Sequence, residues 1–329
     1  MVDEHGGTRA DADLRPLVEA LRAAVGPDAA RWVHWGATSQ DILDTAAMLV
    51  ASRALGPVLA ELDAVADGCA RLALEHRATV MAGRTLLQQA VPITFGLKAA
   101  GWMTGLDAAA ARLAEVRRDR LAVQLGGAAG TLAAFGGDGP RLLADLAADL
   151  GLGEPALPWH TDRTRVAELA AALGEACGAA GKVAGDVVLL AQTEVAEVSE
   201  GDPGAGGSSA MPHKHNPVAA VSTLACADQA PGLVATLLRC MVGEHERAAG
   251  AWQAEWRPLS DLLRLTGSAA AWLRHCLEHL EVDAERMTDN LRRGSEQALR
   301  EHADAKDMLD VGDAVAAAAA LVDRALESR

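Results

Sequence analysis

The chain has 329 residues, with 30 Lys and Arg against 45 Asp and Glu, so its formal net charge is −15. This acidic balance argues against binding to nucleic acid or to anionic membranes, which needs clustered basic residues. No uninterrupted apolar run approaches the roughly 20 residues of a membrane helix, and the polar start of the chain shows no secretory signal.

The composition favours helices over strands. The sequence contains no Tyr and only 2 Phe, and Ala and Leu dominate it. Helices favour Ala and Leu, whereas strands favour aromatic and β-branched residues. The sequence has 5 Cys, an odd number, and no two of them form a CxxC pair. This pattern is typical of buried thiols in a reducing compartment. We therefore expect a cytoplasmic, all-α protein without a disulfide framework or a zinc site.

The predicted elements are long helices over 41–76, 92–124, 163–200, 217–247 and 258–280, with a possible kink at Gly56-Pro57 in the first. Helix 163–200 carries the clearest apolar seam, because its apolar residues step by three and four positions. The seam residues are Val166, Leu169, Leu173, Ala176, Ala180, Val183, Val187 and Leu190. Five long helices of matched length predict an elongated bundle.

The long helices carry Ala- and Leu-rich positions on more than one face. A thin bundle has much surface for its volume, so neighbouring chains would cover such faces. We expect an oligomer, and a monomeric bundle is the alternative.

Three polar stretches, 34–41, 79–94 and 201–217, separate the predicted helices. Long loops on a rigid scaffold tend to carry function. The third stretch holds its hydroxyls, one ammonium and one amide just before Pro217, which suits the first position of a helix. Such a set at a helix N-terminus can bind a carboxylate. A solvated Gly/Ser linker with an Asn cap is an equally good interpretation of these residues alone.

The segment GSSAMPHKHNP, residues 207–217, resembles the GSSxMPxKxNP loop of the fumarase/aspartase superfamily. HWGATSQDILDTA at 34–46 and GRTLLQQAVPITFG at 83–96 agree with that family in order and spacing. The resemblance covers roughly residues 33–282. It implies an all-helical fold and a homotetramer in which the three regions come together from three different subunits.

Within the superfamily the chain is most similar to the bacterial 3-carboxy-cis,cis-muconate cycloisomerase branch. The segments TSQDILDTA, RTLLQQAVPITFGLKAAGW and PWHTDRTR (158–165) carry this similarity. It implies reversible addition–elimination on a small polycarboxylate, favouring formation of carboxymuconolactone in aromatic catabolism. A lyase acting on another substituted succinate, as adenylosuccinate lyase does, and a non-catalytic truncated paralogue are the alternatives.

Two positions depart from fumarase and adenylosuccinate lyase. Leu86 stands where those enzymes carry a catalytic His, and Val221 stands where a Glu orients that His. We expect the His and the Glu to be absent together, because a buried Glu without its His partner would be an unpaired charge. The cycloisomerase branch is similar in lacking this pair.

The resemblance also implies roles for single residues. Ser208 aligns with the serine that exchanges a proton with the carbon next to a carboxylate, and Ser209 is the weaker candidate. Lys214 and the following helix N-terminus would stabilise the serine alkoxide. Lys214 and Asn216 would hold the charge that develops on the substrate carboxylate.

Further substrate contacts are implied for Thr38, Ser39, Thr85, Gln88 and Arg247, with Gln88 preferred over Gln89. Thr38 and Ser39 could equally cap a helix, and Arg247 could pair with Glu244 or Glu246.

His160 and His34 are candidates for the second proton-transfer group, and a packed or surface histidine is the alternative for each. His213 and His215 show no metal-ligand spacing, and we find no cofactor or metal motif. By the same resemblance, residues 1–33 form a shortened N-terminal helical region. Residues 34–281 form the central bundle with its catalytic loops, and residues 282–329 form a reduced C-terminal helical region.

Overall fold

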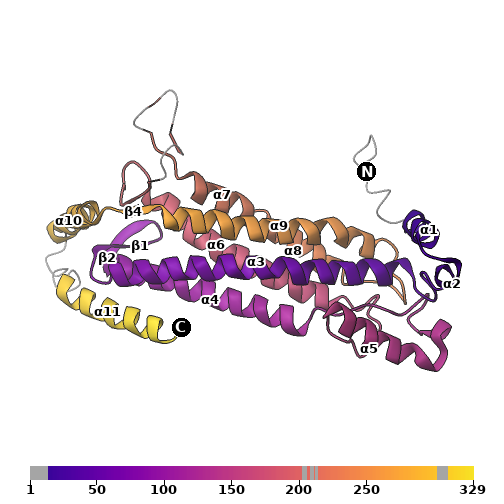
Figure 1. The fold of residues 1–329 in the computed structure, drawn as a ribbon. Coiled ribbons are helices and arrows are strands. Elements are labelled where there is room, and N and C mark those ends of the chain that lie inside the picture. Colours follow the sequence, from indigo (N-terminus) through magenta and orange to yellow (C-terminus); the bar gives the residue numbers. More distant parts are fainter. Residues whose placement is uncertain (1–13, 202–205, 208–210, 212–213, 302–309) are drawn as a thin grey trace. The chain divides into compact units, whose positions relative to one another are not determined.

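A computed structural model describes residues 14–201, 206–207, 211, 214–301 and 310–329, with the backbone alone for 296–301 (Figure 1). Ser208, Ser209 and His213 therefore lie outside the described residues. The fold is an all-α helical bundle, as the composition predicts. The bundle's long helices are α3 (Ser39–Glu75), α4 (Phe95–Asp119), α6 (Thr164–Leu190) and α9 (Ala251–Glu278).

The chain divides into two compact units, and each long helix supplies residues to both. The first unit comprises Met1–Gly56, Ala114–Ala171 and Gly232–Leu263. Its own elements are mostly short helices: α1 (Arg15–Ala24), α2 (Pro27–Ala30), the 3-10 helix η1 (Ala133–Asp138), α5 (Gly139–Leu150) and most of α8 (Ala230–Arg239). Val123, Leu125, Leu143 and Ala147 form a buried cluster between α5 and the strand-like segment after α4.

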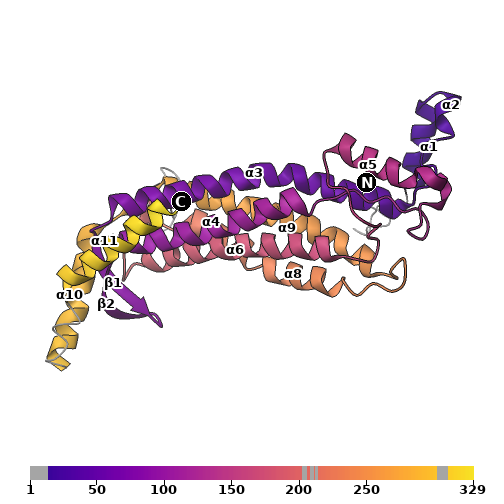
Figure 2. The same cartoon turned by 90° about the horizontal axis from the view of Figure 1, so that it is seen from below.

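The second unit comprises Pro57–Leu113, Ala172–Pro231 and Arg264–Arg329. It holds two small antiparallel sheets and three further helices. These elements are β1 (Val80–Thr85), β2 (Gln88–Thr94), β3 (Val198–Glu200), β4 (Leu280–Val282), α7 (Val218–Ala227), α10 (Ala284–Glu301) and α11 (Val311–Glu327). Strand β1 pairs with β2 and β3 with β4, and the first hairpin packs beside α10 and α11 (Figure 2).

The predicted apolar seam of α6 is confirmed, since all eight of its residues are buried. The helix ends at Leu190, however, and not at Glu200 as predicted. Ala196 adopts a left-handed backbone conformation with φ 51°, which a continuous helix does not allow. The chain turns there, and residues 198–200 pair with β4.

Other predicted boundaries also shift. Helix α4 begins at Phe95 rather than at residue 92, because the Thr94 hydroxyl accepts the amide N–H of Leu97 at 3.1 Å as a helix cap. The predicted helix 217–247 forms as α7 and α8 and ends at Arg239. Helix α9 begins earlier, at Ala251, and continues through Pro258, as α3 continues through Pro57.

Two helical stretches, Ser39–Glu75 and Val218–Arg239, are long and apolar enough to pass a composition test for a membrane span. Neither stretch is an uninterrupted apolar run in the sequence, because each contains polar residues. Core helices of bundles pass the same test, and α3 supplies Met48, Leu55 and Leu62 to the core. The composition of these stretches is therefore weak evidence for a membrane span.

Candidate active site

The first unit places two predicted site residues, Thr38 and His160, in contact with one buried carboxylate. Asp41 lies in the first turn of α3, and its Oδ1 is 2.7 Å from Nε2 of His160. The same carboxylate accepts the amide N–H of Thr38 at 2.9 Å and those of Gly126 and Gly127 at 2.9 and 3.0 Å. A carboxylate has about four acceptor positions, so this one is saturated.

Thr38 directly precedes α3, and the Asp41 contact to its amide is one half of a capping box. The Thr38 hydroxyl accepts a hydrogen bond of 2.6 Å from Nη1 of Arg247. Arg247 therefore turns toward the predicted carboxylate-binding helix start, while Glu244 accepts the amide N–H of Ala249 instead. The Thr38 hydroxyl thus contacts Arg247, and the helix-start contact is made by the Thr38 backbone N–H and the Asp41 side chain.

His160 is held on both its ring and its backbone. Gln40 donates from Nε2 to the His160 carbonyl at 2.8 Å, and both residues are buried. Gly126 presses against the ring, since a Cβ there would stand 2.8 Å from His160 Cε1. The ring orientation is thus fixed by packing and by Asp41. His34 lies in the turn before α3 with φ 61°, and it has no such support among the described contacts.

A second buried network, not predicted from the sequence, lies beside this one. Arg163 donates to Asp44 from Nη1 at 2.8 Å and Nη2 at 3.0 Å, and from Nε to Glu255 at 3.0 Å. Trp252 Nε1 also donates to Asp44, at 3.0 Å. Burial opposes the Arg163 charge, but the two carboxylates outweigh it and raise the pKa of its guanidinium. Burial raises the pKa of the Glu255 carboxyl, and the Arg163 hydrogen bond opposes this rise.

In the second unit, Thr85 and Gln88 pair across the two-residue turn of the β1–β2 hairpin. The sequence predicts a long polar loop over residues 79–94, and the structure forms this hairpin instead. Both turn residues, Leu86 and Leu87, have left-handed φ values of 50° and 64°, as a type I′ turn requires. Leu86 is 97% exposed and Leu87 is 71% exposed. Thr85 and Gln88 therefore stand exposed on either side of an apolar tip.

An ion pair anchors the hairpin close to its turn, where Arg84 pairs with Gln89 across the two strands. Arg84 donates from Nη2 and Nη1 to the two oxygens of Glu197 at 2.6 and 2.9 Å. Glu197 is fully buried, and Asn290 of α10 donates to it at 2.9 Å. Gln89 lies against Gly294, where a Cβ would meet its Oε1 at 1.8 Å. Gln89 thus lies against α10, whereas Gln88 lies next to the exposed tip.

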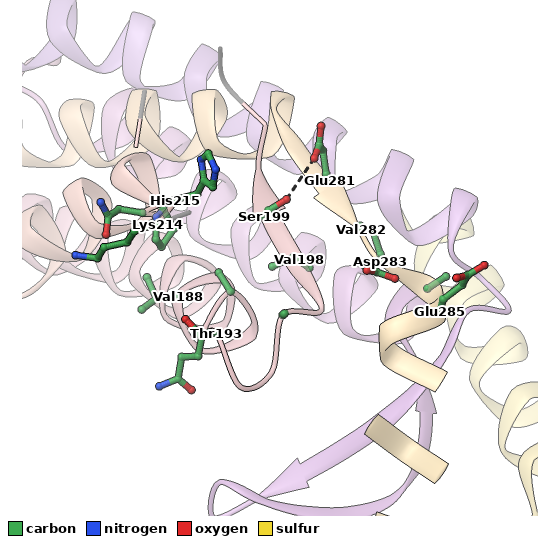
Figure 3. Close-up of a pocket in the computed structure, with 16 residues that line it drawn as sticks. Val188, Thr193, Val198, Ser199, Lys214, His215, Glu281, Val282, Asp283 and Glu285 are labelled. Atoms are coloured by element: carbon green, nitrogen blue, oxygen red, sulfur yellow. Dashed lines mark hydrogen bonds between the residues drawn. The ribbon is translucent and has the colours of Figure 1, made fainter. Parts of the chain in front are cut away.

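Lys214 and Asn216 line a cleft of about 1010 Å³ in the second unit. Figure 3 shows Lys214 and His215 on one side and Glu281, Asp283 and Glu285 on the other. The Asn216 amide donates to the Gly206 carbonyl at 2.9 Å. Asn216 therefore closes the base of the predicted catalytic loop, and Lys214 is the cation that this loop presents to the cleft.

The N-terminus of α7 differs from its predicted role. Glu200 accepts the amide N–H groups of Ala219 and Ala220 at 3.0 and 2.8 Å. The N–H groups of Val218 and Val221 bond to the carbonyls of Asn216 and Pro217. All of the first four N–H groups are satisfied internally, so this helix start offers no donor to a serine alkoxide or a substrate carboxylate. Of the two groups that the sequence predicts for this role, only Lys214 remains a candidate.

Three comparisons with known proteins agree with this fold and these motifs. A sequence profile of the Lyase family matches residues 1–232. The chain is 51% identical over 280 residues to a 3-carboxy-cis,cis-muconate cycloisomerase of Bradyrhizobium diazoefficiens, covering 84% of this chain and 62% of that protein. It is 50% identical over 287 residues to a nitrosuccinate lyase of Streptomyces davaonensis, covering 84% and 60%.

A solved structure of β-carboxy-cis,cis-muconate cycloisomerase from Acinetobacter calcoaceticus superposes with a TM-score of 0.80 and 38% identity. The alignment covers 95% of this chain and 70% of that one. The chain belongs to the lyase family of the fumarase/aspartase superfamily. It spans about three fifths of the length of the curated relatives that it matches, 62% and 60% for the two named above.

Proposed function

We propose that the protein is a cycloisomerase that converts 3-carboxy-cis,cis-muconate to carboxymuconolactone. The observation that carries the proposal is the 51% identity over 280 residues to a relative of that name. The GSSAMPHKHNP loop and the departures at Leu86 and Val221 in this chain are consistent with it. Both departures lie on exposed positions, at 97% and 49% exposure. A Glu at position 221 would therefore not be a buried charge in the single chain, so burial does not explain the joint loss of the His/Glu pair.

The proposed reaction is an isomerisation in which one C–O bond and one C–H bond form across a carbon–carbon double bond. An internal carboxylate oxygen attacks one alkene carbon, and the π electrons move toward the neighbouring carbon and its carboxylate. Lys214 stabilises that developing charge. The Ser208 hydroxyl then gives its proton to the neighbouring carbon, and the resulting alkoxide regains a proton from water before the next turnover. The reverse reaction follows the same steps in the opposite order.

We assign the remaining candidates to substrate binding and positioning. Thr38, Ser39 and Arg247 bind a substrate carboxylate, supported by the contact of Arg247 with Thr38. His160 is the second proton-transfer candidate, supported by its contact with Asp41. Asn216 shapes the loop that presents Lys214, and Thr85 and Gln88 contact the substrate from the hairpin.

We infer that the active form is a homotetramer whose subunits share each site. Among the residues that line the Lys214 cleft, neither Thr85 nor Gln88 is present. Both flank a tip of two exposed leucines. Burial of such a tip against another chain would remove it from water and bring the two polar residues to a neighbour's cleft. The five free, mostly buried thiols fit a location in the cytoplasm.

The decisive assay follows the ultraviolet absorbance of 3-carboxy-cis,cis-muconate with the purified protein, with Ser208→Ala and with Ser209→Ala. We expect turnover by the wild type and by Ser209→Ala, and a loss on the order of 10²- to 10⁴-fold in Ser208→Ala. If Ser209→Ala is inactive and Ser208→Ala is active, the serine assignment is wrong.

The 50% identity to a nitrosuccinate lyase supports a second candidate, a lyase acting on a substituted succinate. Elimination from nitrosuccinate with no change in muconate would favour it. A protein that forms the oligomer but converts neither compound would instead be a non-catalytic paralogue.

A further inference from the structure

Two histidines and one glutamate converge at the C-terminal end of α9, in the second unit. His275, Glu278 and His279 each offer one ligand atom, and these atoms lie within 4.8 Å of one another. The spacing of three and four residues places the side chains on one face of the last helical turn. Both histidines are half-buried and Glu278 is exposed. The substrate roles proposed above use none of the three.

The contacts of His279 define which of its nitrogens can bind a ligand. Its Nδ1 lies 2.8 Å from the carbonyl oxygen of His275. A carbonyl only accepts, so Nδ1 carries the proton and donates it, which leaves the lone pair on Nε2. Metal-binding histidines commonly donate their second N–H to a backbone carbonyl in this way, and the bond fixes the ring and its tautomer.

The two imidazole rings are already close, with centroids 4.3 Å apart and an angle of 41° between planes. Because the two rings are already held close together, a bound ion would have to restrict little further side-chain motion, which lowers the entropic cost of binding. The site also lies at a helix C-terminus, where the last carbonyl groups favour a cation.

Arg274 is a charged neighbour of the cluster, and Arg71 lies close by, donating to the Leu277 carbonyl at 3.4 Å. Arg274 donates from Nη1 to one oxygen of Glu278 at 2.7 Å and from Nε to Glu61 at 2.6 Å. Arg274 is thus neutralised on both sides. One Glu278 oxygen remains to complete a set of two nitrogens and one oxygen.

We propose that His275, Glu278 and His279 form a binding site for a divalent transition-metal ion. Two imidazoles and one carboxylate are ligands that suit Zn²⁺ and Cu²⁺, and three protein ligands leave a coordination position open. The order of affinities for such nitrogen and oxygen donors places Cu²⁺ above Zn²⁺. None of the three ligands lines the Lys214 cleft, although the His279 carbonyl accepts the amide N–H of Gly201 at the start of the predicted catalytic loop. The metal proposal does not depend on the proposed reaction.

Trp272 supplies a local reporter, because its ring lies edge-on to His275 at a centroid distance of 6.3 Å. The experiment titrates the full-length protein with Zn²⁺ by calorimetry and with Cu²⁺ by tryptophan fluorescence. The wild type should bind one additional ion per chain relative to His279→Ala. Cu²⁺ should quench a component of the emission that Trp272→Phe lacks. Zn²⁺ should raise the thermal midpoint, since a ligand that binds only the folded state stabilises it.

His275→Ala and His279→Ala should each weaken the Zn²⁺ affinity by more than about tenfold, and Glu278→Gln should weaken it less. His245→Asn removes an exposed histidine elsewhere and should leave the affinity unchanged. Circular dichroism verifies that each variant is folded, and His279→Gln replaces the ring with an amide that can still donate to the His275 carbonyl. Equal Zn²⁺ stoichiometry and affinity in the wild type and in folded His279→Gln would overturn the proposal.

Discussion

Nε2 of His160 lies 2.7 Å from Oδ1 of Asp41, and both side chains are almost fully buried. The Asp41 carboxylate also accepts amide protons from Thr38, Gly126 and Gly127. One side chain in the first turn of α3 therefore holds a histidine ring, the helix start and a glycine pair in a fixed arrangement.

Asp41→Asn should lower the free energy of unfolding by about 3 kcal/mol. The amide oxygen accepts fewer hydrogen bonds than the carboxylate, and the new NH2 group faces donors that the carboxylate satisfied. Urea denaturation measures the change, with Asp28→Asn on the exposed surface of α2 as the matched control. A loss below about 1 kcal/mol would show that the four hydrogen bonds contribute little net stability.

His160→Gln tests whether the histidine transfers a proton. Glutamine retains an amide that can donate to Asp41, so the thermal midpoint should fall only slightly. If His160 transfers a proton, kcat should fall on the order of 10²- to 10⁴-fold, with a smaller change in KM. A variant with normal kcat at normal stability would restrict His160 to a packing role.

Arg163→Met should destabilise the protein by about 3–5 kcal/mol, because it leaves Asp44 and Glu255 buried without their partner. The triple variant Arg163→Met/Asp44→Leu/Glu255→Met should recover most of that loss, since it removes the buried charges together. Chemical denaturation of the three proteins measures both effects. Equal stability of the single and triple variants would contradict the desolvation argument.

Leu86→Asn/Leu87→Gly places the residues preferred in a type I′ turn at the hairpin tip. The isolated chain should gain roughly 1–2 kcal/mol, because left-handed backbone is costly for leucine. Assembly should weaken, since the exposed leucines are lost. Leu87→Ala is the matched control: it removes the side chain, retains the backbone strain and should weaken assembly without stabilising the chain. Sedimentation velocity that shows unchanged assembly in both variants would exclude the tip as a contact.

Alkaline pH should destabilise the fold through its buried thiols. Burial raises the pKa of Cys69 from 9.0 to about 12. The pKa of Cys69 is higher in the folded protein than in the unfolded chain. Its contribution to the free energy of unfolding is therefore complete below pH 9 and is lost as the pH rises toward 12. The urea midpoint should therefore fall between pH 8 and pH 10.5, and less steeply in Cys69→Ala. Alkylation at pH 8 should be slow at Cys69 in the native protein and fast after unfolding. Rapid labelling of native Cys69 would show that its thiol is accessible.

Local patterns in the sequence determined the helical architecture and part of the candidate site. The α6 seam follows from its three- and four-residue steps, because helical periodicity aligns those positions on one face. The superfamily loop placed Lys214 in a functional segment, and the structure describes it at a cleft.

Only the tertiary structure decided which polar groups meet. Asp41 receives donors from Gly126 and His160, which lie 85 and 119 residues away in sequence. Glu200 caps α7 at Ala219, and Glu197 pairs with Arg84 of the hairpin. The sequence predicts that residues 191–197 continue the helix, yet the chain turns there and Glu197 is buried against Arg84 and Asn290. The spacing of apolar residues in the sequence predicts which face of a helix or strand is buried. The partner of a buried charge lies in a segment far away in the sequence, so no local pattern predicts it.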